Sequence, residues 1–325
     1  MAIESDPGAA PINGKGGGTP TPTMTLYDHV LVPVDGSDEA THAARRGLEL
    51  ARQFGATVDV LHVVGRKTLR LTETADERRR LRERGERVLD EIEELASELD
   101  QPVTTELTEG TPASRIGEYA EERNADLVVI GRQGVTGLGK RLLGGVTEGV
   151  LATSDVPVFV VPHGDRTTED EDADYARVLL PTDGSENATA AARHAATVAR
   201  TYGSTVHVLN VVDLQASGGL FSAGGLEREF VERLESEGQE AIEEVADEVA
   251  GTASGVEVRT AVERTTSFEG AAAGIHEYVT DNDIDLVVMG SHGRSNLQRQ
   301  VIGSVASTVL RTVDVPVVVV TRPSP

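Results

Sequence analysis

The sequence predicts an α/β protein made of two tandem, doubly wound open sheets. Three observations favour this fold class: short β-branched runs alternate with longer amphipathic stretches, the alternation occurs twice, and a glycine-spaced loop follows an apolar run in each half. Strands that alternate with helices favour a parallel sheet with helices on both faces. We therefore expect one such sheet in each half of the chain.

A long internal repeat divides the chain. The segment Leu31-Val-Pro-Val-Asp-Gly-Ser37 matches Leu179-Leu-Pro-Thr-Asp-Gly-Ser185 at five of seven positions, at an offset of 148. The segment Asp155-Val-Pro-Val-Phe-Val-Val161 matches Asp314-Val-Pro-Val-Val-Val-Val320 at six of seven, at an offset of 159. A repeat this long indicates a duplicated domain, because solenoid units run ~20–50 residues. Between its second and fourth strands the second half therefore carries an insertion, part of which is expected at 214–225.

The domain boundaries follow from the repeat and from local composition. Residues 1–24 are rich in Gly, Pro and Thr and predict a disordered tail; a translation start at Met24 would remove nearly all of it. The first domain is expected at 25–162 and the second at 176–322. The acidic stretch between them, 163–175, is typical of a linker.

The elements of the first half follow in order along the chain. The first strand runs into an Asp-Gly-Ser segment, which favours a turn and a helix cap. The longest helix has apolar residues at helical spacing, and two near-continuous apolar runs, 127–130 and 156–161, fit strands buried on both faces. Strands are predicted near 29–34, 57–64, 102–107, 126–130 and 157–161, and helices near 38–54, 75–99, 112–123 and 145–153.

The composition excludes several classes of function. Thirty lysines and arginines against 54 aspartates and glutamates give a formal net charge of −24, which argues against a nucleic-acid-binding surface. Few lysines, few aromatics and this acidic excess resemble proteins of halophilic archaea; an ordinary acidic soluble protein is the alternative. No cysteine is present, which excludes disulfides and thiolate metal sites. No apolar run approaches the ~20 residues of a membrane span, and no secretion signal is evident, so we expect a cytoplasmic protein.

Two glycine loops carry the chemistry. In the second half, Gly290-Ser-His-Gly293 follows an apolar run and is separated by nine residues from Gly303-Ser304. In the first half, Gly131-Arg-Gln-Gly134 is separated by nine residues from Gly144-Gly145. Glycine lets backbone N–H groups approach an anion, and the N-terminus of the following helix adds partial positive charge. Both loops therefore predict phosphate binding.

In doubly wound sheets, ligands bind beyond the carboxyl ends of the strands, where the strand order reverses. If the first strand lies beside the fourth, Asp35 faces the loop 131–145 and Asp183 faces the loop 290–304. Phosphates would then bind to the loop N–H groups and the Ser304 hydroxyl, and the aspartate would serve the nucleoside or a bound metal. The alternative is that Asp-Gly-Ser is only a strand-end turn and helix cap.

These motifs together resemble the universal stress proteins in their tandem, two-domain form. The second half matches the family's nucleotide motif in full at Gly290, Gly293, Gly303 and Ser304, and the first half departs from it at Gly145, where a hydroxyl is expected. The resemblance implies an adenine nucleotide alpha hydrolase-like fold with five parallel strands per sheet in the order 3-2-1-4-5. It also implies ATP, with Mg²⁺, at the crevice between strands one and four.

The same resemblance implies a set of nucleotide-binding residues in each half. In the second half they are Pro181, Thr182, Asp183, Val211, Met289, Gly290, Gly293, Arg294, Gly303, Ser304 and Val305. In the first half they are Pro33, Val34, Asp35, Val63, Ile130, Gly131, Gly134, Gly144, Gly145 and Val146. Because Gly145 lacks a hydroxyl donor worth ~1.5–3 kcal/mol, we expect weaker binding in the first half. No catalytic residue and no protein-held metal site is predicted.

Other motif-like features have plainer interpretations. The segment 134–140 has P-loop spacing, but Arg141 stands where the magnesium-binding Ser or Thr should be. His276-Glu277 lacks the second histidine of a zinc protease, and His62 and His207 are interpreted as packing or surface residues. Five basic residues could pair with phosphate or lie in solvent: Arg132, Lys140, Arg141, Arg294 and Arg299. His292 lies inside the second loop and is the one histidine considered as a contact to the ligand; the alternative is that it does not touch it.

The predicted function is an ATP-binding stress-response regulator that switches between nucleotide-dependent states, without rapid hydrolysis. The two domains are expected to pack on each other through their closing strands, and a homodimer of the whole chain is compatible with this arrangement. Two alternatives remain open. One is a partner-binding scaffold that has lost its nucleotide, and the other is an enzyme of the same nucleotide-binding superfamily.

Overall fold

The computed structural model describes residues 26–65, 75–134, 142–164, 174–215, 228–293 and 302–321. The first half contains β1 (His29–Val34), α1 (Asp38–Phe54), β2 (Thr57–Gly65), α2 (Ala75–Glu98), β3 (Val103–Gly110), α3 (Pro112–Glu122), β4 (Leu127–Gly131), α4 (Gly145–Thr153) and β5 (Val158–Val161). The second half contains β6 (Arg177–Pro181), α5 (Glu186–Tyr202), β7 (Thr205–Asp213), α7 (Arg228–Thr252), β8 (Val258–Thr265), α8 (Ala271–Asp281), β9 (Leu286–Gly290), α9 (Ser304–Thr312) and β10 (Val317–Val320). The elements predicted in the first half are confirmed, each within a few residues at its ends.

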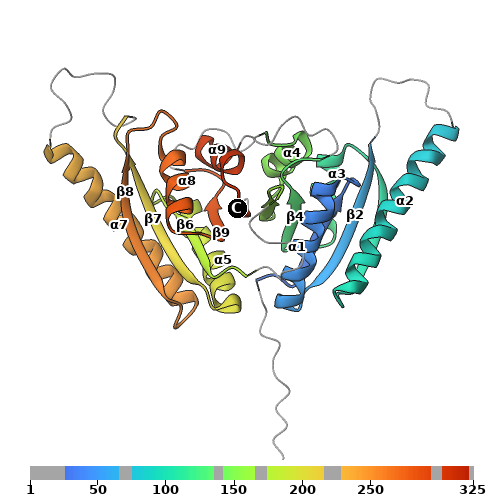
Figure 1. The fold of residues 1–325 in the computed structure, drawn as a ribbon, viewed down its shortest axis with the longest axis horizontal. Coiled ribbons are helices and arrows are strands. Elements are labelled where there is room, and N and C mark those ends of the chain that lie inside the picture. Colours follow the sequence, from blue (N-terminus) through green and yellow to red (C-terminus); the bar gives the residue numbers. More distant parts are fainter. Residues whose placement is uncertain are drawn as a thin grey trace, which may run out of the picture.

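The strands of the described ranges form one continuous sheet in the order β3-β2-β1-β4-β5-β10-β9-β6-β7-β8. Each half therefore has the predicted order 3-2-1-4-5, with parallel neighbours. The two open sheets join edge to edge, because β10 pairs antiparallel with β5 and places Val318 opposite Phe159. In the ribbon the halves form the two arms of a V, with α2 and α7 on the outside (Figure 1).

Matching caps show that the repeat extends to local structure. The Ser37 hydroxyl accepts a hydrogen bond from the backbone N–H of Ala40 at the start of α1, and Ser185 does the same at the start of α5. Both helices end at a glycine in the left-handed region, Gly55 (φ 68°) and Gly203 (φ 72°), a conformation that costs other residues more. The Asp-Gly-Ser segments thus do cap helices.

The extra residues of the second half fall in three places. The offset between equivalent positions is 148 at the strand-two pair His62 and Asn210, and 153 at the glycines that these two side chains approach, Gly85 and Gly238. It becomes 155 in β8 and 159 in α8. Five of the residues therefore lie between β7 and α7, where most of the predicted segment 214–225 lies outside the described residues. Two more lie between Gly238 and β8, and four lengthen the connection from β8 to α8.

An aromatic cluster joins the two halves on one face of the sheet. Tyr27 packs edge-on against Phe54 of α1 with ring centres 5.2 Å apart, and Phe54 lies 6.3 Å from Tyr202 of α5. Tyr202 lies 5.0 Å from Tyr175. The Tyr27 hydroxyl is hydrogen-bonded to Nδ1 of His194, 2.7 Å away. Edge-to-face ring pairs add stabilisation beyond the area they bury, so this cluster ties α1 to α5.

His194 should make the protein sensitive to acid. Burial, with a smaller effect of Arg193, lowers the pKa of His194 to about 4, against ~6.5 in an unfolded chain. The folded state therefore favours the neutral ring, and its contribution is fully present above pH ~6.5 and lost as the pH falls through 4. The half-buried ring keeps some contact with water, so we expect a loss on the order of 2 kcal/mol.

The measurement is the free energy of unfolding by urea from pH 7 to pH 4, for the wild type and His194→Gln. The glutamine does not titrate, so its stability should fall less over this range. Tyr27→Phe is the control, because it removes the hydrogen bond and leaves the histidine to titrate. Parallel curves for the wild type and His194→Gln would contradict the assignment, since the carboxylates contribute equally to both.

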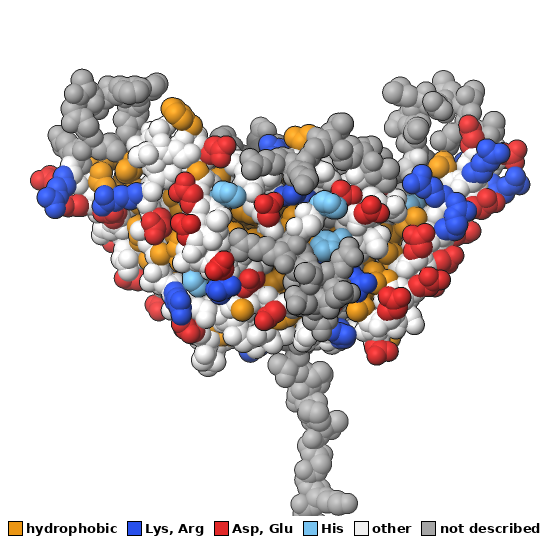
Figure 2. Space-filling model, viewed as in Figure 1, with side chains coloured by type: hydrophobic (Ala, Val, Ile, Leu, Met, Phe, Trp, Pro, Cys, Tyr) orange, Lys and Arg blue, Asp and Glu red, His pale blue; other side chains and the backbone are white. Residues whose placement is uncertain are grey.

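Acidic side chains are spread over both arms of the molecule and are interspersed with arginines along α2 and α7 (Figure 2). Several of these charges pair across elements, as Arg82 with Glu109 and Arg193 with Glu248 do. None of the helices in the described ranges has both the length and the apolar character that a bilayer span requires.

Candidate functional site

An aspartate and a glycine loop meet at the carboxyl end of the first strand in each half. β9 lies beside β6 in the second half, and Oδ1 of Asp183 accepts a hydrogen bond from the backbone N–H of Ser185 (3.0 Å). Its other oxygen lies so close to the α-carbon of Gly293 that a β-carbon there would overlap it. In the first half, Asp35 approaches Gly134 in the same way. The predicted meeting of aspartate and loop is therefore present twice.

The loop of the second half closes on itself where α9 begins. The N–H of Gly303 donates to the carbonyl of Ser291 (2.9 Å), and a β-carbon on Gly303 would lie 2.9 Å from that oxygen. The Asn187 side chain, on α5, donates to the carbonyl of His292 (3.1 Å). These contacts bring the exposed Ser304, the first residue of α9, beside the start of the loop. A helix N-terminus offers unpaired N–H groups and partial positive charge to an anion.

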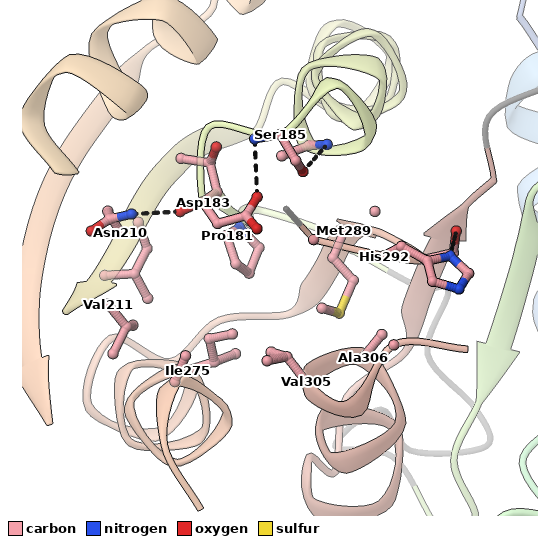
Figure 3. Close-up of a pocket in the computed structure, with 18 of the residues that line it drawn as sticks. Pro181, Asp183, Ser185, Asn210, Val211, Ile275, Met289, His292, Val305 and Ala306 are labelled. Carbon is pink, nitrogen blue, oxygen red and sulfur yellow. Dashed lines mark hydrogen bonds between the residues drawn. The ribbon is translucent and has the colours of Figure 1, made fainter. Parts of the chain in front are cut away.

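These elements enclose a cavity of about 390 Å³ (Figure 3). Val211, Ile275 and Met289 form an apolar wall, and Asp183 and Ser185 lie at the opposite side in the close-up. Ten of the residues predicted for this half line it: Pro181, Thr182, Asp183, Val211, Met289, Gly290, Gly293, Gly303, Ser304 and Val305. The other predicted residue, Arg294, lies outside the described residues. The cavity is thus apolar on one wall and polar at the glycine loop.

Sequence reasoning missed part of the lining. Ser185 and Ser291 belong to the two motifs but were not predicted as binding residues, and motifs gave no signal for the other members: Ala188, Leu209, Asn210, Ala271, Ile275 and Ala306. Asn210 has a clear structural role, because its side chain donates to the carbonyl of Thr182 (2.8 Å) and so fixes the end of the first strand. Its position immediately before Val211 could have indicated it. Ala271 and Ile275 line the cavity because α8 packs beside it, and no sequence motif indicates that packing.

His292 lines the cavity, and its ring points away from the apolar wall (Figure 3). Its Nδ1 lies 3.0 Å from the hydroxyl of Ser291. His62 and His207 are packing residues: His62 donates from Nδ1 to the carbonyl of Val34 (2.9 Å), and Nδ1 of His207 lies 3.0 Å from the Tyr278 hydroxyl. Burial lowers the pKa of both histidines. Among the described residues, no group of three or more His, Asp and Glu side chains could hold a metal.

The first half repeats the backbone of this site with different side chains. The predicted residues occupy the equivalent positions: Pro33, Val34, Asp35, Val63, Ile130, Gly131, Gly134, Gly144, Gly145 and Val146. Gly144 donates to the carbonyl of Arg132 (2.9 Å), as Gly303 does to Ser291. The differences are at the lining: Gly145 stands for Ser304, and the buried Thr147 stands for Ala306 and donates to the carbonyl of Gly131 (2.8 Å).

Arg132 does not face the phosphate position of its own loop. Its side chain is 4% exposed and donates from Nη1 to the carbonyl of Val313 (3.0 Å), with Leu310 at 3.5 Å, both in the other half. The phosphate pairing considered for Arg132 is therefore wrong, because the guanidinium is committed to the end of α9. The other basic candidates, Lys140, Arg141, Arg294 and Arg299, lie outside the described part of the chain.

Comparisons with known proteins agree with the duplicated architecture. A family model described as the universal stress protein family matches residues 26–162 and 174–321. A universal stress protein of Methanocaldococcus jannaschii is 38% identical over 142 residues, which cover 42% of this chain and 82% of the relative. A universal stress protein of Bacillus subtilis is 30% identical over 148 residues, covering 42% of this chain and 99% of the relative. Each of these relatives thus matches a length close to one half.

Solved structures also match both halves together. The crystal structure of a universal stress protein from Archaeoglobus fulgidus has a TM-score of 0.68 to this chain and covers 91% of this chain and 99% of its own. The two sequences are 24% identical over that alignment. At this identity the likeness shows the fold alone.

Proposed function

The chain belongs to the universal stress protein family, and from its sites we propose that it binds ATP, tightly in the second half and more weakly in the first. The observation that carries this proposal is the meeting of Asp183 with Gly293 beside a cavity of about 390 Å³. That volume lies in the range of small-molecule sites. The apolar wall and the glycine loop supply what the base and the phosphates of a nucleotide require.

Each part of ATP has a matching part of the cavity. The adenine would pack between Val211, Ile275 and Met289, which bury its apolar faces. The carboxylate of Asp183 would accept hydrogen bonds from the ribose hydroxyls. The phosphates would bind to the N–H groups of Gly293 and the start of α9, with the Ser304 hydroxyl as a further donor.

Magnesium would enter with the nucleotide. Mg²⁺ is usually held by one or two carboxylates together with substrate phosphates and water. Because Asp183 is assigned here to the ribose, the phosphates and water would hold the ion. Hydrolysis needs a group that orients the attacking water. In the described part of the cavity the titratable side chains are Asp183 and His292, and both accept or share hydrogen bonds with neighbouring serines. We therefore propose a cytoplasmic regulator that responds to nucleotide binding, rather than an enzyme of rapid turnover.

The direct test is a calorimetric titration of ATP–Mg²⁺ into protein stripped of bound nucleotide, at high salt because of the net charge of −24. We expect two binding events whose Kd values differ by about tenfold or more, since the first half lacks one charge-assisted hydrogen bond. Nucleotide content after denaturing extraction, measured in parallel, checks that the stripping was complete.

The absence of any binding by stripped protein would contradict the proposal and favour the partner-binding scaffold, which Gly145 already makes plausible for the first half. A yellow protein, or fast release of phosphate or pyrophosphate, would favour an enzyme of the same superfamily. If the tighter of the two sites survived Gly303→Asp/Ser304→Asp, the assignment of that site to the second half would be wrong.

A further inference from the structure

Arg132 belongs to the first glycine loop by its backbone. It follows β4 directly, its N–H donates to the carbonyl of Val161 (2.7 Å), and its carbonyl accepts from the N–H of Gly144 (2.9 Å). Its backbone therefore spans the start of the loop and the point where α4 begins. The side chain is 4% exposed, so it is fixed by packing as well as by hydrogen bonds.

The side chain of Arg132 ends at the C-terminus of α9, in the other half. There Nη1 donates to the carbonyl of Val313 (3.0 Å) and lies 3.5 Å from that of Leu310. The last carbonyls of a helix have no partner within the helix, and a cation is favourable there because of the helix dipole. Low exposure strengthens this interaction, since water screens it little.

α9 carries the second-half phosphate cradle at its other end. The helix has nine residues and begins at Ser304, so the two ends are ~13 Å apart. A packed helix moves as a rigid element. An arginine that holds its C-terminus therefore also sets the position of the N–H groups and the hydroxyl at its N-terminus.

The link runs in one direction among the described residues. The residue equivalent to Arg132 in the second loop is Ser291, whose hydroxyl lies 3.0 Å from the ring of its neighbour His292. At the end of α4, which is the equivalent of α9, Ser154 donates to the carbonyl of Val156 (3.0 Å). The first half thus supplies an arginine to the end of α9, whereas the equivalent residue of the second half is a serine.

We propose that Arg132, although it lies in the first glycine loop, is a positioning residue for the phosphate cradle of the second half. This inference rests on the proposed ATP binding. It makes a prediction that a purely structural role does not make. Substitution of Arg132, in the first loop, should weaken the ATP site of the second half more than the ATP site of the first half.

The test is a two-site titration of ATP–Mg²⁺ into the full chain carrying Arg132→Met, which fills the buried volume without donors. We expect the tight site to weaken by about tenfold, in the usual range of such coupling, and the weak site to change less. Arg132→Lys keeps the charge and should restore part of the affinity. Arg46→Met is the matched control: Arg46 is also buried in the first half but bonds Glu49 in its own helix (2.8 Å), and its loss should leave the tight site unchanged.

Hydrogen exchange of the α9 amides, measured without nucleotide, gives a second readout. Faster exchange in Arg132→Met than in Arg46→Met is expected. A folded Arg132→Met protein with an unchanged tight site, or with unchanged exchange in α9, would overturn the inference while leaving ATP binding intact. If the wild type binds no ATP, it is the proposed function that fails.

Discussion

Replacing Gly303 and Ser304 together by aspartate is expected to abolish the tighter ATP site, with a loss of at least about 100-fold in affinity. A side chain at position 303 would meet the carbonyl of Ser291, which its β-carbon would approach to 2.9 Å. Two carboxylates would also stand where phosphates are proposed to bind, and an uncompensated charge in such a site costs ~3–5 kcal/mol. Calorimetric titration of the stripped variant should then detect only the weaker, first-half site.

The matched control is Gly144→Asp/Gly145→Asp, the same change at the equivalent positions of the first half. It should remove the weaker site and leave the tighter one within about twofold of the wild type. If each variant weakened both sites equally, the effect would come from general destabilisation. If the second-half variant kept the tight site, the assignment of the tight site to the loop of Gly293 and Gly303 would be wrong.

Gly145→Ser is expected to strengthen the first-half site by about tenfold or more. The change restores the hydroxyl that Ser304 provides in the other half, and a hydrogen bond to a charged group contributes ~1.5–3 kcal/mol. The added side chain has room, because among the described residues no atom lies within 4 Å of a β-carbon at position 145. Gly145 is the first residue of α4. The hydroxyl of the introduced serine would therefore lie at the helix N-terminus, where an anion is favoured.

Gly145→Ala separates the hydroxyl from the β-carbon. Alanine makes the same backbone change and improves helix propensity, but offers no donor to a phosphate. We expect its two ATP affinities to equal those of the wild type, while Gly145→Ser brings the two sites close together. Equal gains in both variants would mean that helix formation, rather than the hydroxyl, limits the first site.

Much of the fold could be predicted because local signals and the repeat agreed. The strands of β4 and β5 are short, continuous apolar runs, and the serines at 37 and 185 cap the helices that follow. The general rule for doubly wound sheets then predicted that Asp183 faces the loop 290–304. The change of offset from 148 to 159 could not show that the insertion is shared among three connections, because the two matches do not locate the extra residues between them.

The contacts between the halves could not be predicted from the sequence. Arg132 follows a glycine in a phosphate-type loop, where a basic residue usually suggests an anion, yet it is buried against α9. The pair Tyr27 and His194 lies 167 positions apart, and no periodicity connects them. Ile275 forms part of the cavity wall because of the way α8 packs. Such contacts depend on how the two sheets meet, which a pattern within one half does not encode.

The pairing of Phe159 with Val318 has a consequence for how the two halves can evolve. These residues are equivalents in the repeat and stand opposite each other where β5 meets β10. In a dimer of identical chains, a two-fold axis would pass between them, and each residue would have to face its own copy. Duplication within one chain removes that requirement, so a phenylalanine can face a valine and an arginine can be kept on one side alone. Covalent fusion also fixes the ratio of the two different glycine loops at one to one, which random pairing of separate subunits would not.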